Sequence, residues 1–173
     1  GLARIYDAAI GNAFGMEMVT WEQVGAPTYR PALRLFTSNF SEAHLAFGKY
    51  TTETDYFEFA RFTHTGNFGI GISVPTSTFH VIGSISNSIT VISGNLTLTA
   101  SHKTVIIPLG SAFTITLPTA SGISGRVYTI VNNTNGAKTI GSYINLAGTT
   151  VTTIGTASSV EVQSDGTNWY QIR

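Results

Sequence analysis

A run without charged side chains is the strongest constraint on this sequence: from Phe62 to His102 there is no Asp, Glu, Lys or Arg. Ser, Thr, Asn and Gly interrupt the run every few residues, so no window approaches the ~20 apolar residues that a membrane-spanning helix needs. Charged residues make up 10% of the whole chain, compared with about 25% in an ordinary soluble domain. Because so much of a monomer's surface would lack charge, we expect this chain to associate with other chains and not to insert into a membrane.

The residue types favour β-structure over helix. Thr, Ser, Gly, Val and Ile dominate the second half of the chain, where the helix formers Lys, Glu and Gln are scarce. The formal net charge is zero and no basic stripe occurs, so electrostatic attraction would recruit neither nucleic acid nor anionic lipid. The chain has no cysteine, which excludes thiol catalysis, disulfides and thiolate metal sites. We therefore predict an all-β protein with no cofactor and no nucleic-acid partner.

Charge and aromatic content divide the chain into three predicted parts, residues 1–65, 66–94 and 95–173. The first part has aromatic residues at short intervals, and residues 57–62 alternate in the manner of a strand. We expect this part to be a β-rich segment of a trimer. A short helix over residues 40–47 is an alternative within it.

The second part, residues 66–94, combines closely spaced glycines with apolar side chains. These are Gly66, Gly69, Gly71 and Gly83, set among Ile70, Ile72, Val74, Phe79, Val81 and Ile82. A single thin strand of this make-up cannot bury its own apolar side chains. Identical copies around a common axis would cover them and would close the strand edges. The pattern therefore predicts an intertwined homotrimeric shaft.

The third part, residues 95–173, alternates apolar residues with threonines, as in Phe113, Ile115 and Leu117. This period is typical of half-buried antiparallel strands. Asn-Gly at residues 135–136 and Asp-Gly at residues 165–166 each separate two strand-like runs, which predicts two hairpins. We expect a small antiparallel β-sandwich or barrel, the head of a fibre.

Two stretches resemble viral fibre proteins. Gly66-Asn67-Phe68-Gly69-Ile70-Gly71-Ile72, followed by Pro75 and by Phe79-His80-Val81-Ile82-Gly83, is similar to a segment common in phage tail fibres and related trimeric spikes. Three runs in the third part, residues 115–118, 125–130 and 163–170, resemble a C-terminal module that recurs in tail fibres and other viral surface proteins. The sequence departs from the first pattern at Ile72 and Ser73, where threonines are usual, and at Thr78, where a charged residue is common.

The resemblance implies the receptor-binding tip of a phage tail fibre. In such a tip a trimeric shaft leads into a terminal head, which would bind a cell-surface glycan or an outer-membrane receptor of the host. Upstream fibre or tail proteins would be further partners, and the protein would be extracellular, on a virion whose genes can also lie in a prophage. The His-x-His pairs that hold iron in some tail fibres do not occur, because His44, His64, His80 and His102 are scattered.

Receptor binding would use aromatic and amide side chains on loops of the head, since rings stack on the C–H faces of sugars and amides fix their orientation. Trp169 and Tyr170 point to opposite faces if they share a strand. One of them then belongs to the core, and packing is the favoured role of Trp169. The candidate receptor-binding residues are Asn132, Asn133, Asn135, Tyr143, Asn145 and Trp169.

Two alternatives to a non-enzymatic attachment protein stay open. One is a structural shaft or connector whose receptor-binding part lies on another chain. The other is a tailspike enzyme that degrades polysaccharide, which needs two carboxylates about 5 to 10 Å apart in a cleft. Only Glu161 and Asp165 are available in the head, and Asp165 is already accounted for as a turn residue. We predict no catalytic residue.

A histidine near a three-fold axis would be present three times and would be able to hold an ion there. His64 and His80 are the candidates because they lie beside or within the predicted shaft. A packed, hydrogen-bonded histidine is the more common outcome, and we predict no metal site.

Overall fold

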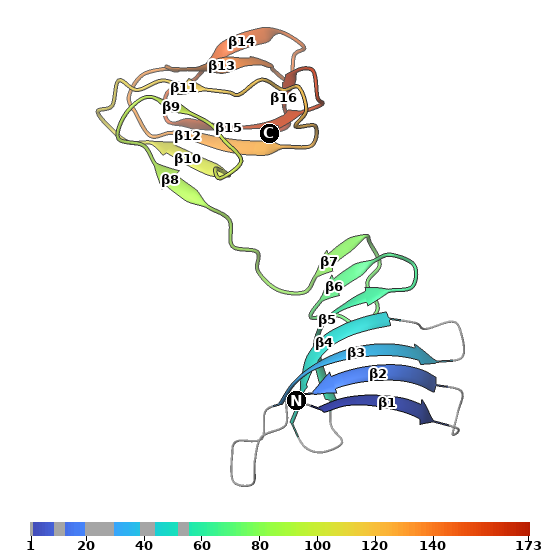
Figure 1. Ribbon diagram of the computed structural model, residues 1–173. Coiled ribbons are helices and arrows are strands. Elements are labelled where there is room, and N and C mark those ends of the chain that lie inside the picture. The colour runs from blue at the N-terminus through green and yellow to red at the C-terminus, as the bar shows by residue number, and fades with distance from the viewer. Residues whose placement is uncertain (1, 9–12, 20–29, 39–43, 52–55) are drawn as a thin grey trace. The chain divides into compact units, whose positions relative to one another are not determined.

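The computed structural model describes residues 2–8, 13–19, 30–38, 44–51 and 56–173, which form two compact units, residues 1–85 and 86–173 (Figure 1). The described residues contain β-strands and no helix, which confirms the prediction of an all-β protein. No described segment is a helix long and apolar enough to cross a membrane.

The N-terminal unit is one curved sheet whose seven strands follow one another in sequence order (Figure 1). Neighbouring strands are antiparallel, except that β6 and β7 are parallel. The strands are β1 (Leu2–Ala8), β2 (Ala13–Val19), β3 (Arg30–Ser38), β4 (His44–Tyr50), β5 (Tyr56–Thr63), β6 (Phe68–Ile70) and β7 (Phe79–Val81). The alternative of a helix over residues 40–47 is wrong for residues 44–47, which belong to β4, and residues 40–43 lie outside the described part.

A β-bulge interrupts the pairing of β4 with β5. Phe47 lies opposite Ala60, but Gly48 lies opposite Glu58, so Phe59 is the extra residue of β5. Gly48 is required here, because a Cβ atom at this position would lie 2.3 Å from the Phe57 carbonyl oxygen. The extra residue shifts the alternation of β5 by one position, so residues three apart across it, such as Glu58 and Arg61, lie on the same face of the sheet.

The C-terminal unit contains a mixed seven-stranded sheet in the order β14-β13-β16-β15-β12-β10-β8 and a two-stranded parallel sheet of β9 and β11. The strands are β8 (Ile89–Val91), β9 (Leu96–Thr97), β10 (Thr104–Ile107), β11 (Ile115–Thr116), β12 (Val127–Asn132), β13 (Lys138–Ile144), β14 (Thr150–Ile154), β15 (Ser158–Ser164) and β16 (Trp169–Gln171). The expectation of a purely antiparallel head is wrong, since β10 pairs in parallel with both β8 and β12, and β13 pairs in parallel with β16. Crossover connections, which sequence alternation does not reveal, join these strands.

One of the two predicted hairpins is confirmed. β15 and β16 are antiparallel on either side of Asp165-Gly166, with Ser164 opposite Trp169. The hairpin at Asn135-Gly136 is wrong, because both neighbouring places beside β12 are taken by β10 and β15. β13 instead lies on the far side of β16, next to the edge strand β14.

A single hydrophobic core holds the C-terminal unit together. β12 and β15 alternate, so Tyr128 and Ile130 of β12 and Val160 and Val162 of β15 are all buried. The β9 and β11 segments cover this face of the large sheet and add their own buried residues, including Leu98, Ile115 and Leu117. Gly141 in β13 permits the close approach of β11, since a Cβ atom there would lie 2.6 Å from the Leu117 nitrogen.

Residues 66–94, the expected shaft, are divided between the two units. β6 and β7 complete the N-terminal sheet, whereas β8 is an edge strand of the C-terminal sheet. The intertwining of three copies along this segment stays a prediction.

Candidate functional site

A cleft of about 330 Å³ opens in the C-terminal unit where two connections meet. One wall is the turn before β11, with Leu109, Gly110 and Ser111. The other wall is the β12–β13 connection, with Thr134, Asn135 and Gly136, and Lys138 at the start of β13. Asn135, one of the predicted receptor contacts, thus lines a cleft.

Asn132, whose side chain lies in the interior, fixes the shape of the β12–β13 wall of the cleft. Its side chain is fully buried, because it follows Tyr128 and Ile130 on the inward face of β12. The amide nitrogen donates to the carbonyl oxygens of Gly136 (2.9 Å) and Gly155 (2.7 Å). Its oxygen accepts from the Thr134 backbone N–H (3.0 Å) and lies 2.7 Å from the Thr134 hydroxyl. Both donors and both acceptor sites of the Asn132 carboxamide are therefore used. These hydrogen bonds stabilise the β12–β13 connection in place of the backbone hydrogen bonds of a β-ladder.

Lys138 connects the two walls of the cleft. Its ammonium group donates to the Ser111 carbonyl oxygen. An ammonium has three donors, so one contact leaves further donors for a ligand. Asn135 is exposed beside it, and Leu109, exposed by 69%, provides an apolar surface at the rim. The cleft thus offers ammonium and amide donors, backbone groups and one apolar wall, which suit a hydroxyl-rich ligand.

The other predicted receptor contacts do not gather around this cleft. Asn133 is exposed in the same connection, but it does not line the cleft. Asn145 acts as a turn cap, because its side-chain oxygen accepts the backbone N–H groups of Ala147 (3.0 Å) and Thr149 (2.9 Å).

Tyr143, like Asn132, is buried, which corrects the expectation that it lies on the surface, and Trp169 is buried in agreement with its favoured packing role. The Tyr143 hydroxyl donates to the Thr153 carbonyl (2.9 Å), and burial raises the pKa of this phenol. The Trp169 indole N–H donates to the Pro118 carbonyl (2.8 Å). Tyr170 is 38% exposed, so the alternation of these two rings follows the expected pattern, with Trp169 as the packing residue.

Sequence reasoning missed Lys138, Leu109 and Ser111. Lys138 is one of only four basic residues after His102, and that scarcity was an available signal. Nothing in the sequence joins it to Ser111, which lies 27 residues earlier.

The two carboxylate side chains of the C-terminal unit serve structural contacts. Glu161 accepts from Lys103 (3.0 Å) and from the Thr129 hydroxyl (3.2 Å), and the hydrogen bond from Lys103 is the main reason that the pKa of Glu161 is lowered. Asp165 caps its turn through the backbone N–H groups of Asn168 and Thr167, both at 2.7 Å, which lower the pKa of its carboxyl group. Neither carboxylate lines the cleft.

Within the described residues, no group of three or more His, Asp or Glu side chains is arranged to hold a metal ion. His80 is hydrogen-bonded inside its own unit, since its Nδ1 accepts the Thr76 backbone N–H at 3.2 Å. His64 is exposed in the turn after β5.

Comparisons with protein-family models, with curated proteins and with solved structures give no match to this chain. The geometry of the two units therefore carries the functional argument.

Proposed function

We propose that this chain is a subunit of a homotrimeric phage tail fibre tip, which attaches the virion to a glycan or another outer-membrane component of its host without catalysis. The observation that carries the proposal is the cleft between Ser111 and Lys138, which presents hydrogen-bonding groups but no carboxylate. Glycan binding uses such groups, whereas glycan hydrolysis requires a pair of carboxylates.

Exposed apolar residues support the assembly into trimers. Within the charge-free run, Ile82, Ile85, Ile89 and Val91 are exposed by 60%, 62%, 68% and 60%. Monomeric soluble proteins rarely expose so many large apolar side chains in one short stretch of sequence. Three copies would also present three clefts to a repetitive surface, so weak individual sites would suffice for firm attachment.

The test is binding of the full chain to a panel of bacterial strains, with and without their purified surface polysaccharides as competitors. We expect binding to a subset of strains that polysaccharide competes away. The Asn135→Trp variant fills the cleft and should lose binding, whereas Asn133→Trp, in the same connection but outside the cleft lining, should retain it.

Three outcomes would contradict the proposal. Release of reducing ends from polysaccharide would indicate an enzyme. Absence of binding to strains that the intact virus infects would indicate a connector whose receptor-binding part lies on another chain. Equal binding by both tryptophan variants would contradict the assignment of the receptor-binding site to the cleft.

A further inference from the structure

The N-terminal sheet has one face built from two apolar rows. Residues directly opposite one another on neighbouring strands share a face, so the strand register defines each row. The first row crosses β3 to β7 through Leu35, Leu45, Phe62, Phe68 and Phe79. The second crosses the same strands through Leu33, Phe47, Ala60, Ile70 and Val81. We call these ten residues the apolar face.

The register extends the two rows to the start of the sheet. Leu35 lies opposite Met16, which lies opposite Ile5, and Leu33 lies opposite Met18, which lies opposite Ala3. No charged residue occupies any position of either row across the seven strands.

Among the described residues of the N-terminal unit, no second layer of strands lies over the apolar face, since all seven strands belong to one sheet. Its large side chains are correspondingly exposed: Leu35 by 43%, Phe47 by 41%, Phe62 by 44%, Ile70 by 37% and Phe79 by 57%. The aromatic rings already stack along the row, with centroids 4.2 Å apart for Phe62 and Phe68 and 5.9 Å apart for Phe68 and Phe79. They form a continuous apolar surface on one side of the sheet.

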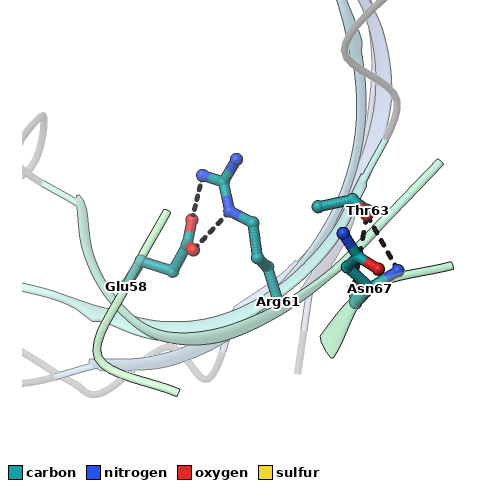
Figure 2. Close-up of polar contacts among 4 residues, drawn as sticks. All are labelled: Glu58, Arg61, Thr63 and Asn67. Carbon is teal, nitrogen blue, oxygen red and sulfur yellow. Dashed lines mark hydrogen bonds and ion pairs between the residues drawn. The ribbon is translucent and has the colours of Figure 1, made fainter. Parts of the chain in front are cut away.

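The opposite face carries the charged residues of β5 (Figure 2), and its side chains are less exposed than the large ones of the apolar face: Ala46 is fully buried, and Arg61 and Glu58 expose 19% and 17% of their side chains. Arg61 donates from Nε and one terminal nitrogen to the two Glu58 oxygens, at 2.6 and 2.7 Å. The bulge at Phe59 makes this pair possible, because an unbroken strand would send residues three apart to opposite faces. On the same side, the Thr63 hydroxyl accepts the Asn67 backbone N–H at 3.1 Å. Glu58 and Arg61 of β5 thus lie on the other face from Ala60 and Phe62, whereas Lys49 of β4 lies opposite Phe57 on the apolar side, with its Nζ 5.8 Å from the centroid of the Phe59 ring.

The exposed area is large enough for a specific interface. An aromatic side chain buries about 150 to 250 Å², so three half-exposed Phe side chains leave about 300 Å² uncovered. The aliphatic side chains of the two rows, together with Phe57 and Phe59, which lie outside the ten residues beside Lys49 and are exposed by 57% and 45%, bring the total to about 600 to 700 Å². A stable complex of standard size buries about 800 Å² on each partner.

We infer that the apolar face is buried against the same face of further copies of this chain. A surface that packs against this face must be apolar and uncharged over the two rows. The same face of a second copy meets both conditions, because it carries the same two rows. Like faces packed around a common axis also form a closed assembly, which ends growth and removes the exposed surface. The inference rests on the proposed homotrimer and states which surface its copies share.

The first experiment compares molar mass in solution for the full chain and two variants at micromolar concentration and on dilution. For the wild type we expect a trimer of about 55 kDa, three times the 18.4 kDa of one chain. Phe62→Ser combined with Phe79→Ser should weaken association by about a thousandfold or more, because two ring contacts with the neighbouring copy are lost. Leu146→Ser is the matched control, since Leu146 is 72% exposed on a loop of the other unit and should leave the trimer unchanged.

A second measurement decides the matter if the double variant does not fold. The chain has no cysteine, so a single introduced thiol reports its own accessibility. We expect Phe79→Cys to react with a maleimide at least about tenfold more slowly than Leu146→Cys in the trimer, and to become reactive when dilution dissociates it.

The outcomes separate this inference from the proposed function. A wild-type monomer would overturn both. A double variant that resists dissociation on dilution as well as the wild type does, or a trimer in which the thiols at positions 79 and 146 react equally fast, would overturn the inference alone. Protection of the thiol at position 79 that persists in the dissociated chain would mean that the same chain covers the face, and this too would overturn the inference.

Discussion

Replacement of Asn132 by alanine tests whether the buried amide network holds the cleft together. The change removes two donated hydrogen bonds, to Gly136 and Gly155, and leaves the buried backbone N–H of Thr134 without its acceptor. An unsatisfied buried donor costs about 1 to 3 kcal/mol, and each lost bond to a carbonyl that water can reach costs about 0.5 to 1.5 kcal/mol. The Thr134 hydroxyl lies 2.9 Å from the Gly136 oxygen and offsets part of this loss. We expect a destabilisation of about 3 kcal/mol.

In a unit of this size, that change lowers the melting temperature by about 12 to 24 °C. The assay is denaturation followed by tryptophan fluorescence in a Trp21→Phe background, at one fixed protein concentration because association adds to stability. Trp169 then reports the C-terminal unit alone, since it lies buried in β16. Asn133→Ala is the control and should change the free energy of unfolding by less than about 0.5 kcal/mol, because its side chain is exposed. A loss below about 1 kcal/mol for Asn132→Ala would refute the network as a structural support of the cleft.

Three further predictions concern stability. Trp169→Phe should destabilise the C-terminal unit by about 2 kcal/mol, measured by urea denaturation followed by circular dichroism, because the Pro118 carbonyl loses its donor and a cavity opens. Gly48→Ala should lower the melting temperature of the N-terminal unit at a cost of about 1 to 3 kcal/mol, since its methyl group would collide with the Phe57 carbonyl. Gly94→Ala, whose methyl meets no atom within 4 Å, should leave the melting temperature of its own C-terminal unit unchanged. The lowered pKa of Glu161 contributes stability that is fully present above pH 4.5, its ordinary value, and is lost as the pH falls through the folded-state pKa. Glu161→Gln should remove this pH-dependent part of the free energy of unfolding, at most about 1 kcal/mol, so the melting temperature should fall less steeply with decreasing pH. A variant whose melting temperature depends on pH as in the wild type would contradict the assignment.

Local patterns in the sequence predict features that depend on residues close together in the chain, such as a turn or the face of a strand on which a side chain lies. The Asp165-Gly166 hairpin is correct because Asp165 caps the turn with its own side chain and the two strands that it joins pair directly. The same period-2 alternation that places Trp169 inward and Tyr170 outward also places Asn132 on the inward face of β12, after Tyr128 and Ile130. Asn132 was therefore identifiable as buried from the pattern alone.

Features that depend on distant segments do not follow from the sequence. Asn135-Gly136 carries a strong hairpin signal, yet β10 and β15 occupy both sides of β12, and the competition between strands is a property of the whole sheet. The cleft likewise arises because Ser111 and Lys138 meet across two connections. Alternation defines faces of a strand, but not which strands become neighbours.

The charge-free run acquires a different meaning in each unit. In β6 and β7 it supplies Phe68, Ile70, Phe79 and Val81, which extend the two apolar rows, and a charged residue at any of these positions would break the apolar face. In residues 95–102 it supplies Leu98 to the core of the C-terminal unit and Leu96 to its edge, while most of the other residues are exposed. Residues 82–91 have neither explanation, because their isoleucines are exposed in a single chain and gain nothing from being apolar there. Copies of the chain that meet on both this segment and the apolar face would remove this cost at two separate surfaces, so a variant that weakens one surface should lower the trimer's affinity without abolishing the trimer at high concentration.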